Sequence, residues 1–136
     1  MYVMVLQNYS GGAGVLGTCV MAASLALVDA GVEVYDMVVC CCVAVVPRSV
    51  VSSGGEGGEG ASSSSTHVLL ADPTESEIQV SDGVVTLAMM PNWKEITFWD
   101  QVGRLPVGVA SDAADLCQDG CGTMQKFVRK ALVGGS

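Results

Sequence analysis

Cysteine is the residue type with the most reactive side chain in this 136-residue sequence. The six cysteines are Cys19, Cys40, Cys41, Cys42, Cys117 and Cys121. Their spacing contains no Cys-x-x-Cys pair, and His67 is the single histidine, so we expect no zinc site. Three consecutive cysteines on an extended strand would point to alternating faces of a sheet. We therefore interpret all six as free thiols that pack as small hydrophobic side chains.

Two groups of charged residues are close enough in sequence to bind a ligand. The acidic group consists of Asp72, Glu75, Glu77 and Asp82. Its spacing is not that of a calcium-binding loop, so we interpret these residues as solvated acids of turns. The basic group, near the C-terminus, consists of Lys126, Arg129 and Lys130. These residues suit the negative end of a helix, and contact with RNA or a protein partner is the alternative.

Three further features are candidates for a catalytic or binding role: a histidine, an aromatic cluster and a glycine turn. His67 has no nearby candidate nucleophile other than the serines of residues 62–65, so we expect no catalytic role for it. Trp93, Phe98 and Trp99 lie in and beside a predicted hairpin, where we expect core packing rather than stacking on bases. Residues 11–12 are glycines ahead of a predicted helix. We read them as a tight turn, with anion binding through backbone N–H groups as the alternative.

Composition limits the class of protein. Hydrophobic residues make up 50 % of the chain, which provides enough apolar material for the core of one domain and excludes a wholly disordered chain. The formal net charge is −8, so the isolated chain would repel a phosphate backbone. Stand-alone binding to nucleic acid is therefore disfavoured.

Targeting signals and membrane spans have recognisable patterns of charge and hydropathy. Residues 1–7 carry no basic side chain, so we expect no secretory signal and a reducing compartment. Residues 13–32 are mostly apolar but include Asp29 and three glycines. The apolar run at residues 37–46 has about half the length of a helical span. We expect a soluble chain with no membrane contact.

Hydrophobic periodicity predicts the elements of the first half. Residues 2–6 read as a short apolar strand, and residues 13–30 as a helix that Gly31 ends. Residues 37–46 are apolar without alternation, as in a central strand covered on both faces, and Pro47 ends them. Residues 48–66 are rich in serine and glycine, so we expect a disordered surface insertion.

The second half is predicted to contain three strands and a helix. Residues 67–71 read as a strand, and residues 84–90 and 95–99 as a hairpin. Ser111 is expected to cap a helix through residue 132, in which Gly120 and Gly122 would mark the close approach of another element. The order predicts an α+β fold, with helices on one face of a mixed sheet.

Four motifs occur in an order that is typical of a known family. They are Leu6-Gln7 and paired glycines with Ala22-Ala23-Ser24-Leu25-Ala26-Leu27-Val28-Asp29-Ala30-Gly31; Leu70-Ala71-Asp72-Pro73-Thr74; Val85-Thr86-Leu87-Ala88-Met89-Met90-Pro91-Asn92; and Ala114-Asp115-Leu116-Cys117. Together they resemble the C-terminal half of the RNase PH family of 3′ exoribonuclease domains. Among its members they are most similar to eukaryotic RNA exosome ring subunits of the messenger-RNA-transport type. The resemblance implies a partial RNase PH-like domain over residues 1–136, with residues 48–66 inserted and the N-terminal half of the usual domain absent.

The resemblance also indicates where a catalytic site would be. In active relatives an arginine after the glycine turn holds phosphate, and two acidic residues serve metal binding and catalysis. Here residues 13–17 follow the turn and none is basic, while the two acidic positions fall on Ile78 and Val84. Arg48 is the only basic residue in the first 91 residues. We therefore predict no catalytic, cofactor-binding or metal-binding residue.

These inferences predict a non-catalytic structural subunit of the RNA exosome core ring that supports 3′→5′ RNA processing and degradation, including rRNA processing and mRNA decay. Its partners would be other RNase PH-like exosome subunits in a hetero-hexameric ring, with RNA bound indirectly through the ring. The expected location is the nucleus, nucleolus and cytoplasm, and no cofactor is expected. One alternative is a phosphate-dependent 3′→5′ exoribonuclease subunit whose active site a partner chain completes. Another is a truncated product without function.

Overall fold

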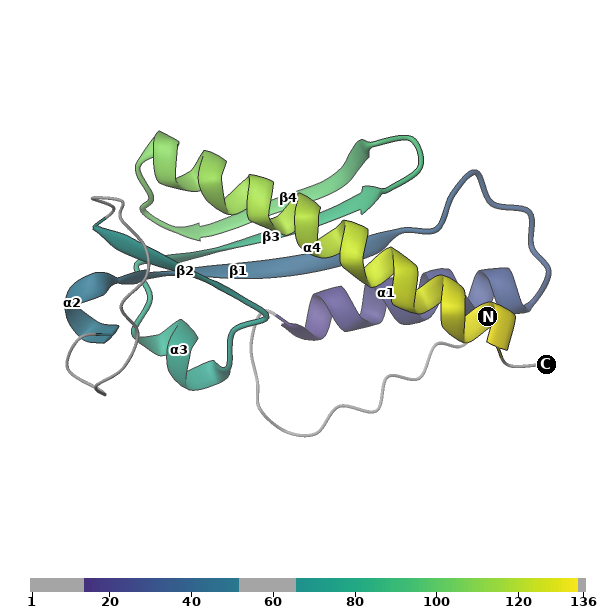
Figure 1. The fold of residues 1–136 in the computed structure, drawn as a ribbon, viewed down its shortest axis with the longest axis horizontal. Coiled ribbons are helices and arrows are strands. Elements are labelled where there is room, and N and C mark those ends of the chain that lie inside the picture. Colours follow the sequence, from purple (N-terminus) through teal and green to yellow (C-terminus); the bar gives the residue numbers. More distant parts are fainter. Residues whose placement is uncertain (1–13, 52–65, 135–136) are drawn as a thin grey trace.

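A computed structural model describes residues 14–51 and 66–134 of the chain. These residues form a four-stranded sheet in the order β2-β1-β3-β4 together with four helices (Figure 1). The elements in chain order are α1 (Gly14–Asp29), β1 (Val39–Pro47), α2 (Arg48–Val51), β2 (His67–Ala71), α3 (Glu75–Gln79), β3 (Gly83–Met90), β4 (Glu95–Gly103) and α4 (Val107–Gly134). The strand predicted for residues 2–6 lies outside the described residues, as does most of the predicted insertion.

The prediction of a central strand is confirmed. β1 lies between β2 and β3, and seven of its nine residues are buried. Its residues alternate between two apolar faces, so that the strand needs a covering layer on each side. The bounds differ slightly from the prediction, because pairing starts at Val39 and includes Pro47.

Helices cover both faces of the sheet. On one face Val43 and Val45 of β1 pack with Leu87 of β3 against α4, through Ala113, Cys117 and Cys121. On the other face the alternate residues form a second core with Ile78 of α3, and α1 packs there with Gly17 beside Cys40. The prediction of helices on one face was therefore wrong. Apolar residues on both faces of β1 require two covering layers.

The predicted mixed sheet was also wrong, because all three pairings among the described strands are antiparallel. The predicted hairpin is confirmed: β3 and β4 are joined by a turn at residues 91–94, with a bulge between Ala88 and Met89. β4 continues to Gly103 instead of stopping near residue 99. At Gly103 the backbone has φ +95 and passes close to the Asp82 carbonyl, which leaves no room for a side chain.

The observed helix ends confirm one of the predicted start and stop signals and contradict another. α1 stops at Asp29, and Gly31 follows with φ +69, as predicted for a glycine stop. Ser111 does not cap α4, so that prediction was wrong. The helix begins at Val107, directly after Pro106, whose carbonyl oxygen already accepts a hydrogen bond from the Ala110 N–H (2.9 Å). Arg48–Val51 forms the short helix α2, which corrects the start of the segment expected to be disordered.

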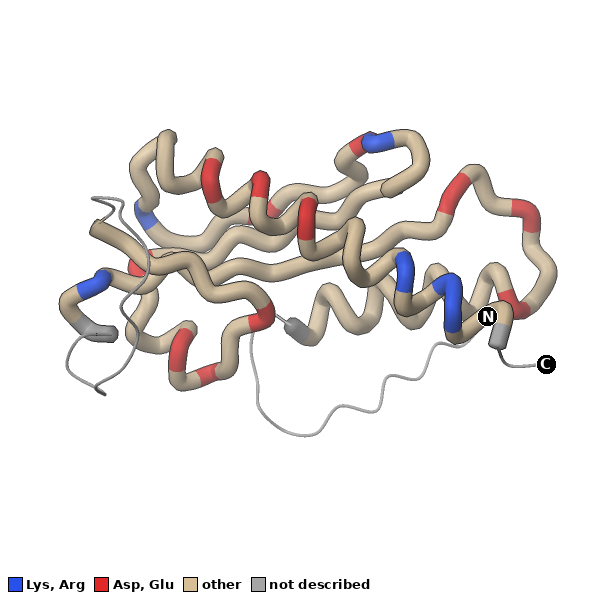
Figure 2. The backbone as a smooth tube through the Cα atoms, in the orientation of Figure 1, with Lys and Arg blue, Asp and Glu red and all other residues tan. Residues whose placement is uncertain are grey.

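Charge is unevenly distributed along the molecule (Figure 2). Acidic residues are spread over the loop between α1 and β1, over α3 and over the first half of α4. The second half of α4 carries Lys126, Arg129 and Lys130. Within the described ranges no helix is both long enough and apolar enough to cross a membrane.

Candidate functional site

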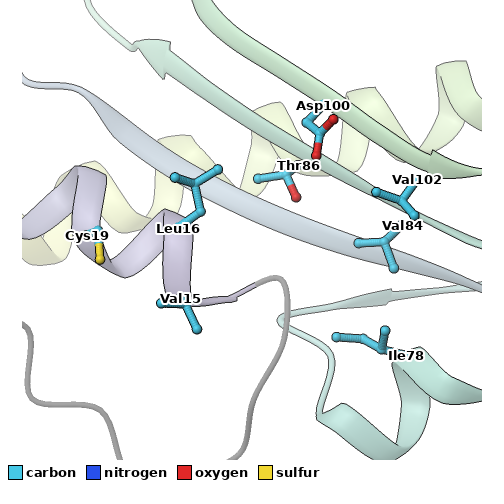
Figure 3. A pocket seen from close by; sticks show the side chains of 8 residues that line it. All are labelled: Val15, Leu16, Cys19, Ile78, Val84, Thr86, Asp100 and Val102. Carbon is cyan, nitrogen blue, oxygen red and sulfur yellow. The ribbon is translucent and has the colours of Figure 1, made fainter.

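A cleft of about 510 Å³ lies between α1, α3 and the sheet (Figure 3). The cleft opens on the face of the sheet that α1 and α3 flank. Its eight lining residues are Val15, Leu16, Cys19, Ile78, Val84, Thr86, Asp100 and Val102. Val15 and Leu16 follow the predicted glycine turn, and Ile78 and Val84 are the two expected acidic positions. The fold therefore brings both parts of the expected site together.

Two helices and one strand pairing position these side chains. The start of α1 supplies Val15, Leu16 and Cys19, and α3 supplies Ile78. On the sheet, Val84 pairs with Val102 and Thr86 with Asp100, so all four side chains share one face. α1 can approach β1 because Gly17 has no side chain: a Cβ there would lie 3.2 Å from the Cys40 sulfur.

The lining of the cleft is mostly apolar. Thr86 is buried, and its hydroxyl donates to the Cys42 sulfur at 3.6 Å, so it is already engaged within the core. Asp100 is the one carboxylate among the eight lining residues, and none of the eight carries a positive charge. The described residues contain no cluster of three His, Cys, Asp or Glu side chains that could hold a metal ion.

This lining determines what the cleft can do chemically. Phosphoryl transfer requires positive groups or a carboxylate-held metal to neutralise the charge on the reacting phosphate. One exposed carboxylate would instead repel a phosphate. An apolar lining of this kind favours the binding of apolar side chains.

The cleft includes three residues that were not singled out from the sequence, Thr86, Asp100 and Val102. Strand alternation contained the relevant signal, because Thr86 lies two positions after Val84 and therefore on the same face. Asp100 could be placed only from the hairpin register, which pairs it with Thr86. Residues 10–13 of the predicted glycine turn lie outside the described residues.

The acidic group does not form a site. Glu77 caps α3: its carboxylate accepts hydrogen bonds from the Thr74 N–H (2.7 Å) and the Thr74 hydroxyl (2.8 Å). Both bonds stabilise the ionised form, which lowers the pKa of the Glu77 carboxyl. Asp82 is occupied by an ion pair with His67, in which Nε2 lies 3.3 Å from the carboxylate. Asp72 and Asp82 lie in the bends on either side of α3, as the interpretation of these acids as turn residues predicted, whereas Glu75 and Glu77 lie in α3 itself.

The basic group lies away from the cleft, on the second half of α4. Arg129 donates from Nη2 to the Asn92 side-chain oxygen (2.9 Å), which joins α4 to the hairpin turn. The aromatic cluster is exposed, with Trp93 at 62 %, Phe98 at 39 % and Trp99 at 43 % of their accessible surface. Our prediction of core packing for these three was wrong. Phe98 and Trp99 lie on β4, the edge strand, and all nine residues of β4 are exposed.

A comparison of the sequence with protein-family models finds no match, and a search of the curated proteins finds none either. The functional assignment therefore starts from two features of this chain. One is the apolar cleft, and the other is the order of the sequence motifs described above.

Proposed function

We propose that this protein is a non-catalytic structural subunit of an RNA exosome core ring. Its partners are RNase PH-like subunits, and it supports 3′→5′ RNA processing and decay in the nucleus, nucleolus and cytoplasm by contributing to the assembly. One observation carries the proposal: Val15, Leu16, Ile78 and Val84 meet in one cleft, and all four are apolar. By the resemblance, Ile78 and Val84 correspond to the two acidic positions of active relatives, and Val15 and Leu16 belong to residues 13–17, where the phosphate-holding arginine would lie.

Electrostatics supports the absence of catalysis. The nucleic acid backbone is a polyanion, while this chain has a net charge of −8 and a carboxylate, Asp100, at the cleft. Binding an RNA end there would bring negative charges together without a compensating cation. A role that uses apolar contact agrees better with this lining.

The exposed edge of the sheet supports an assembly role. β4 presents the apolar side chains of Ile96, Phe98, Trp99 and Val102, which are between 39 % and 64 % exposed. A long apolar edge strand readily adds a strand or an apolar surface from another chain. We assign β4 and the adjoining cleft as the surface on which a ring subunit packs.

The test is reconstitution with RNase PH-like exosome subunits, followed by native mass spectrometry. We expect the chain to enter a complex of defined stoichiometry. Val102→Asp places a charge on the edge strand and should weaken incorporation at least about tenfold, because a buried unpaired charge is costly. Val133→Asp is the matched control, since it makes the same change at a side chain that is 80 % exposed near the end of α4. Failure of the wild-type chain to associate with every subunit tried would refute the proposal.

A second measurement separates an assembly role from a partner-completed enzyme. The assembled complex is given a single-stranded RNA with inorganic phosphate, and released nucleoside diphosphates are counted. We expect Asp100→Asn in this chain to leave any release unchanged. A loss of release on this substitution would show that the cleft takes part in catalysis.

A further inference from the structure

Three thiols meet where α4 crosses the central strand. Cys41 projects from β1 toward α4, and Cys117 and Cys121 of α4 are fully buried against the sheet. The helix comes unusually close at this point, since a Cβ on Gly120 would lie only 2.6 Å from the Cys41 sulfur. The contact places two potential partners within reach of Cys41.

The hydrogen bonds distinguish the two partners. Cys121 is directed at the backbone, with its sulfur 3.7 Å from the Val39 carbonyl oxygen and 3.8 Å from that of Leu87. Cys117 lies 3.7 Å from the Val85 carbonyl oxygen, and Cys41 packs against the cluster that contains both helix thiols. Cys117 therefore makes one backbone contact where Cys121 makes two, and it is the helix thiol we take as the partner of Cys41.

Cys41 is also accessible from outside the core. β2 pairs with β1 only from Val43 onward, so no strand of the described chain covers the β1 edge beside Cys41. A small cleft of about 50 Å³ opens there, lined by Cys41 together with Thr18, Asp72 and Met124. Cys41 is partly exposed, whereas Cys117 is fully buried behind it. A small oxidant therefore meets Cys41 first.

We propose that Cys41 and Cys117 form a reversible oxidation site for hydroperoxides. The Cys41 thiolate attacks one oxygen of the hydroperoxide, the O–O bond breaks, and the other oxygen leaves with a proton as alcohol or water. The Cys117 sulfur then attacks the resulting sulfenic acid. An S–S bond forms, the S–O bond breaks, and the oxygen leaves as water with the Cys117 proton. Two thiols lose two electrons in total, and the hydroperoxide gains them.

The acidity of the thiols supports this order of events. The hydrogen bond from Cys117 lowers the pKa of the Cys41 thiol, against the opposing effects of burial and of Asp72. Burial raises the pKa of Cys40 to about 11 and that of Cys121 to about 12, and it also raises the pKa of Cys42. Because the thiolate is the nucleophile, Cys41 is the member of this cluster suited to react.

The disulfide would connect β1 to α4 across the main core. A cross-link between residues far apart in sequence stabilises a fold by restricting the unfolded chain. Oxidation should therefore raise the Tm of the chain, and a thiol reductant should return it to the starting value.

The experiment uses the full chain, reduced and then treated with a small excess of hydrogen peroxide. We expect intact mass spectrometry to show the loss of two hydrogens, and peptide mapping without reductant to join Cys41 to Cys117. In Cys117→Ser the reaction should stop at a Cys41 sulfenic acid, which dimedone traps. Cys41→Ser should abolish both products.

Two controls keep the outcome specific. Cys121→Ser changes a cysteine on the same helix that is as buried as Cys117, and it should leave the Cys41–Cys117 bond in place. Cys19→Ser changes a partly buried cysteine on α1 and should also leave that bond in place. The peptide map of the wild-type chain does not depend on whether any variant folds. A disulfide between other cysteines, or equal dimedone labelling of all six, would overturn the proposal.

Discussion

Gly120 and Gly122 of α4 differ in how closely they approach the sheet. Gly120 faces β1, where a Cβ would collide with the Cys41 sulfur, while Gly122 has nothing within 4 Å of the same position. The sequence suggested a close approach at both. The structure requires glycine only at position 120, because the helix turns residue 122 away from the sheet.

Alanine substitution should separate these two glycines. Gly122→Ala is expected to raise the free energy of unfolding by about 1 kcal/mol, because alanine is the better helix former. Gly120→Ala is expected to lower it by about 1–3 kcal/mol, because the added methyl group overpacks the contact with Cys41. Urea denaturation followed by circular dichroism measures both. Equal effects at the two positions would contradict the close contact.

The Glu77 cap predicts a pH dependence. A carboxyl whose pKa is lower in the folded chain stabilises the fold above the pKa of the unfolded chain, and this stabilisation is lost as the pH falls through the folded pKa. Glu77→Gln should therefore lower the Tm at pH 7. The difference from the wild type should shrink as the pH falls below the ordinary value of 4.5. Thermal melts across this range test it, with Glu95→Gln on β4 as a control for the charge change.

At the scale of elements, Asn92 joins three segments. In the hairpin turn it donates from its backbone N–H (2.8 Å) and its side-chain amide (2.7 Å) to Asp36 in the loop before β1. Its side-chain oxygen accepts hydrogen bonds from Gln125 (3.0 Å) and Arg129 (2.9 Å) of α4. The second half of α4 is thus attached to the hairpin through one exposed side chain.

Removing this side chain should loosen the end of α4. We expect Asn92→Ala to increase hydrogen exchange in residues 123–134 and to cost about 1 kcal/mol, since exposed hydrogen bonds contribute modestly to stability. Hydrogen exchange with mass spectrometry reports both the site and the extent. Trp93→Phe is the matched control, because it removes only the bond from the indole N–H to the Tyr35 carbonyl oxygen (3.2 Å). Unchanged exchange in Asn92→Ala would show that core packing alone holds the helix.

At the scale of the whole molecule, net charge and surface hydrophobicity point to protein partners. The charge of −8 opposes RNA binding, while the exposed apolar side chains of β4 favour contact with protein. We therefore expect the isolated chain to show no binding to single-stranded RNA at physiological ionic strength, measured by fluorescence anisotropy. Binding that weakens steeply with added salt would instead indicate that the basic residues of α4 contact the phosphate backbone.

Local sequence patterns determined several elements of this fold. The unbroken apolar run of β1 predicted a central strand, the residues between β3 and β4 predicted a hairpin, and Gly31 predicted the end of α1. Each is a short-range signal, in which backbone preference or periodicity points to one conformation. The sequence also shows that Ile78 and Val84 are apolar. The resemblance to the RNase PH family implies acidic residues at these two positions.

Tertiary structure alone decided which residues meet. Periodicity showed that both faces of β1 are apolar, but it did not show that α1 and α4 take opposite faces. It also did not show that Phe98 and Trp99 remain exposed on an edge strand, or that Cys41 packs against the face of α4 that carries Cys117 and Cys121. Sequence periodicity assigns a residue to a face of its own element, whereas these outcomes depend on the register and packing between elements distant in sequence.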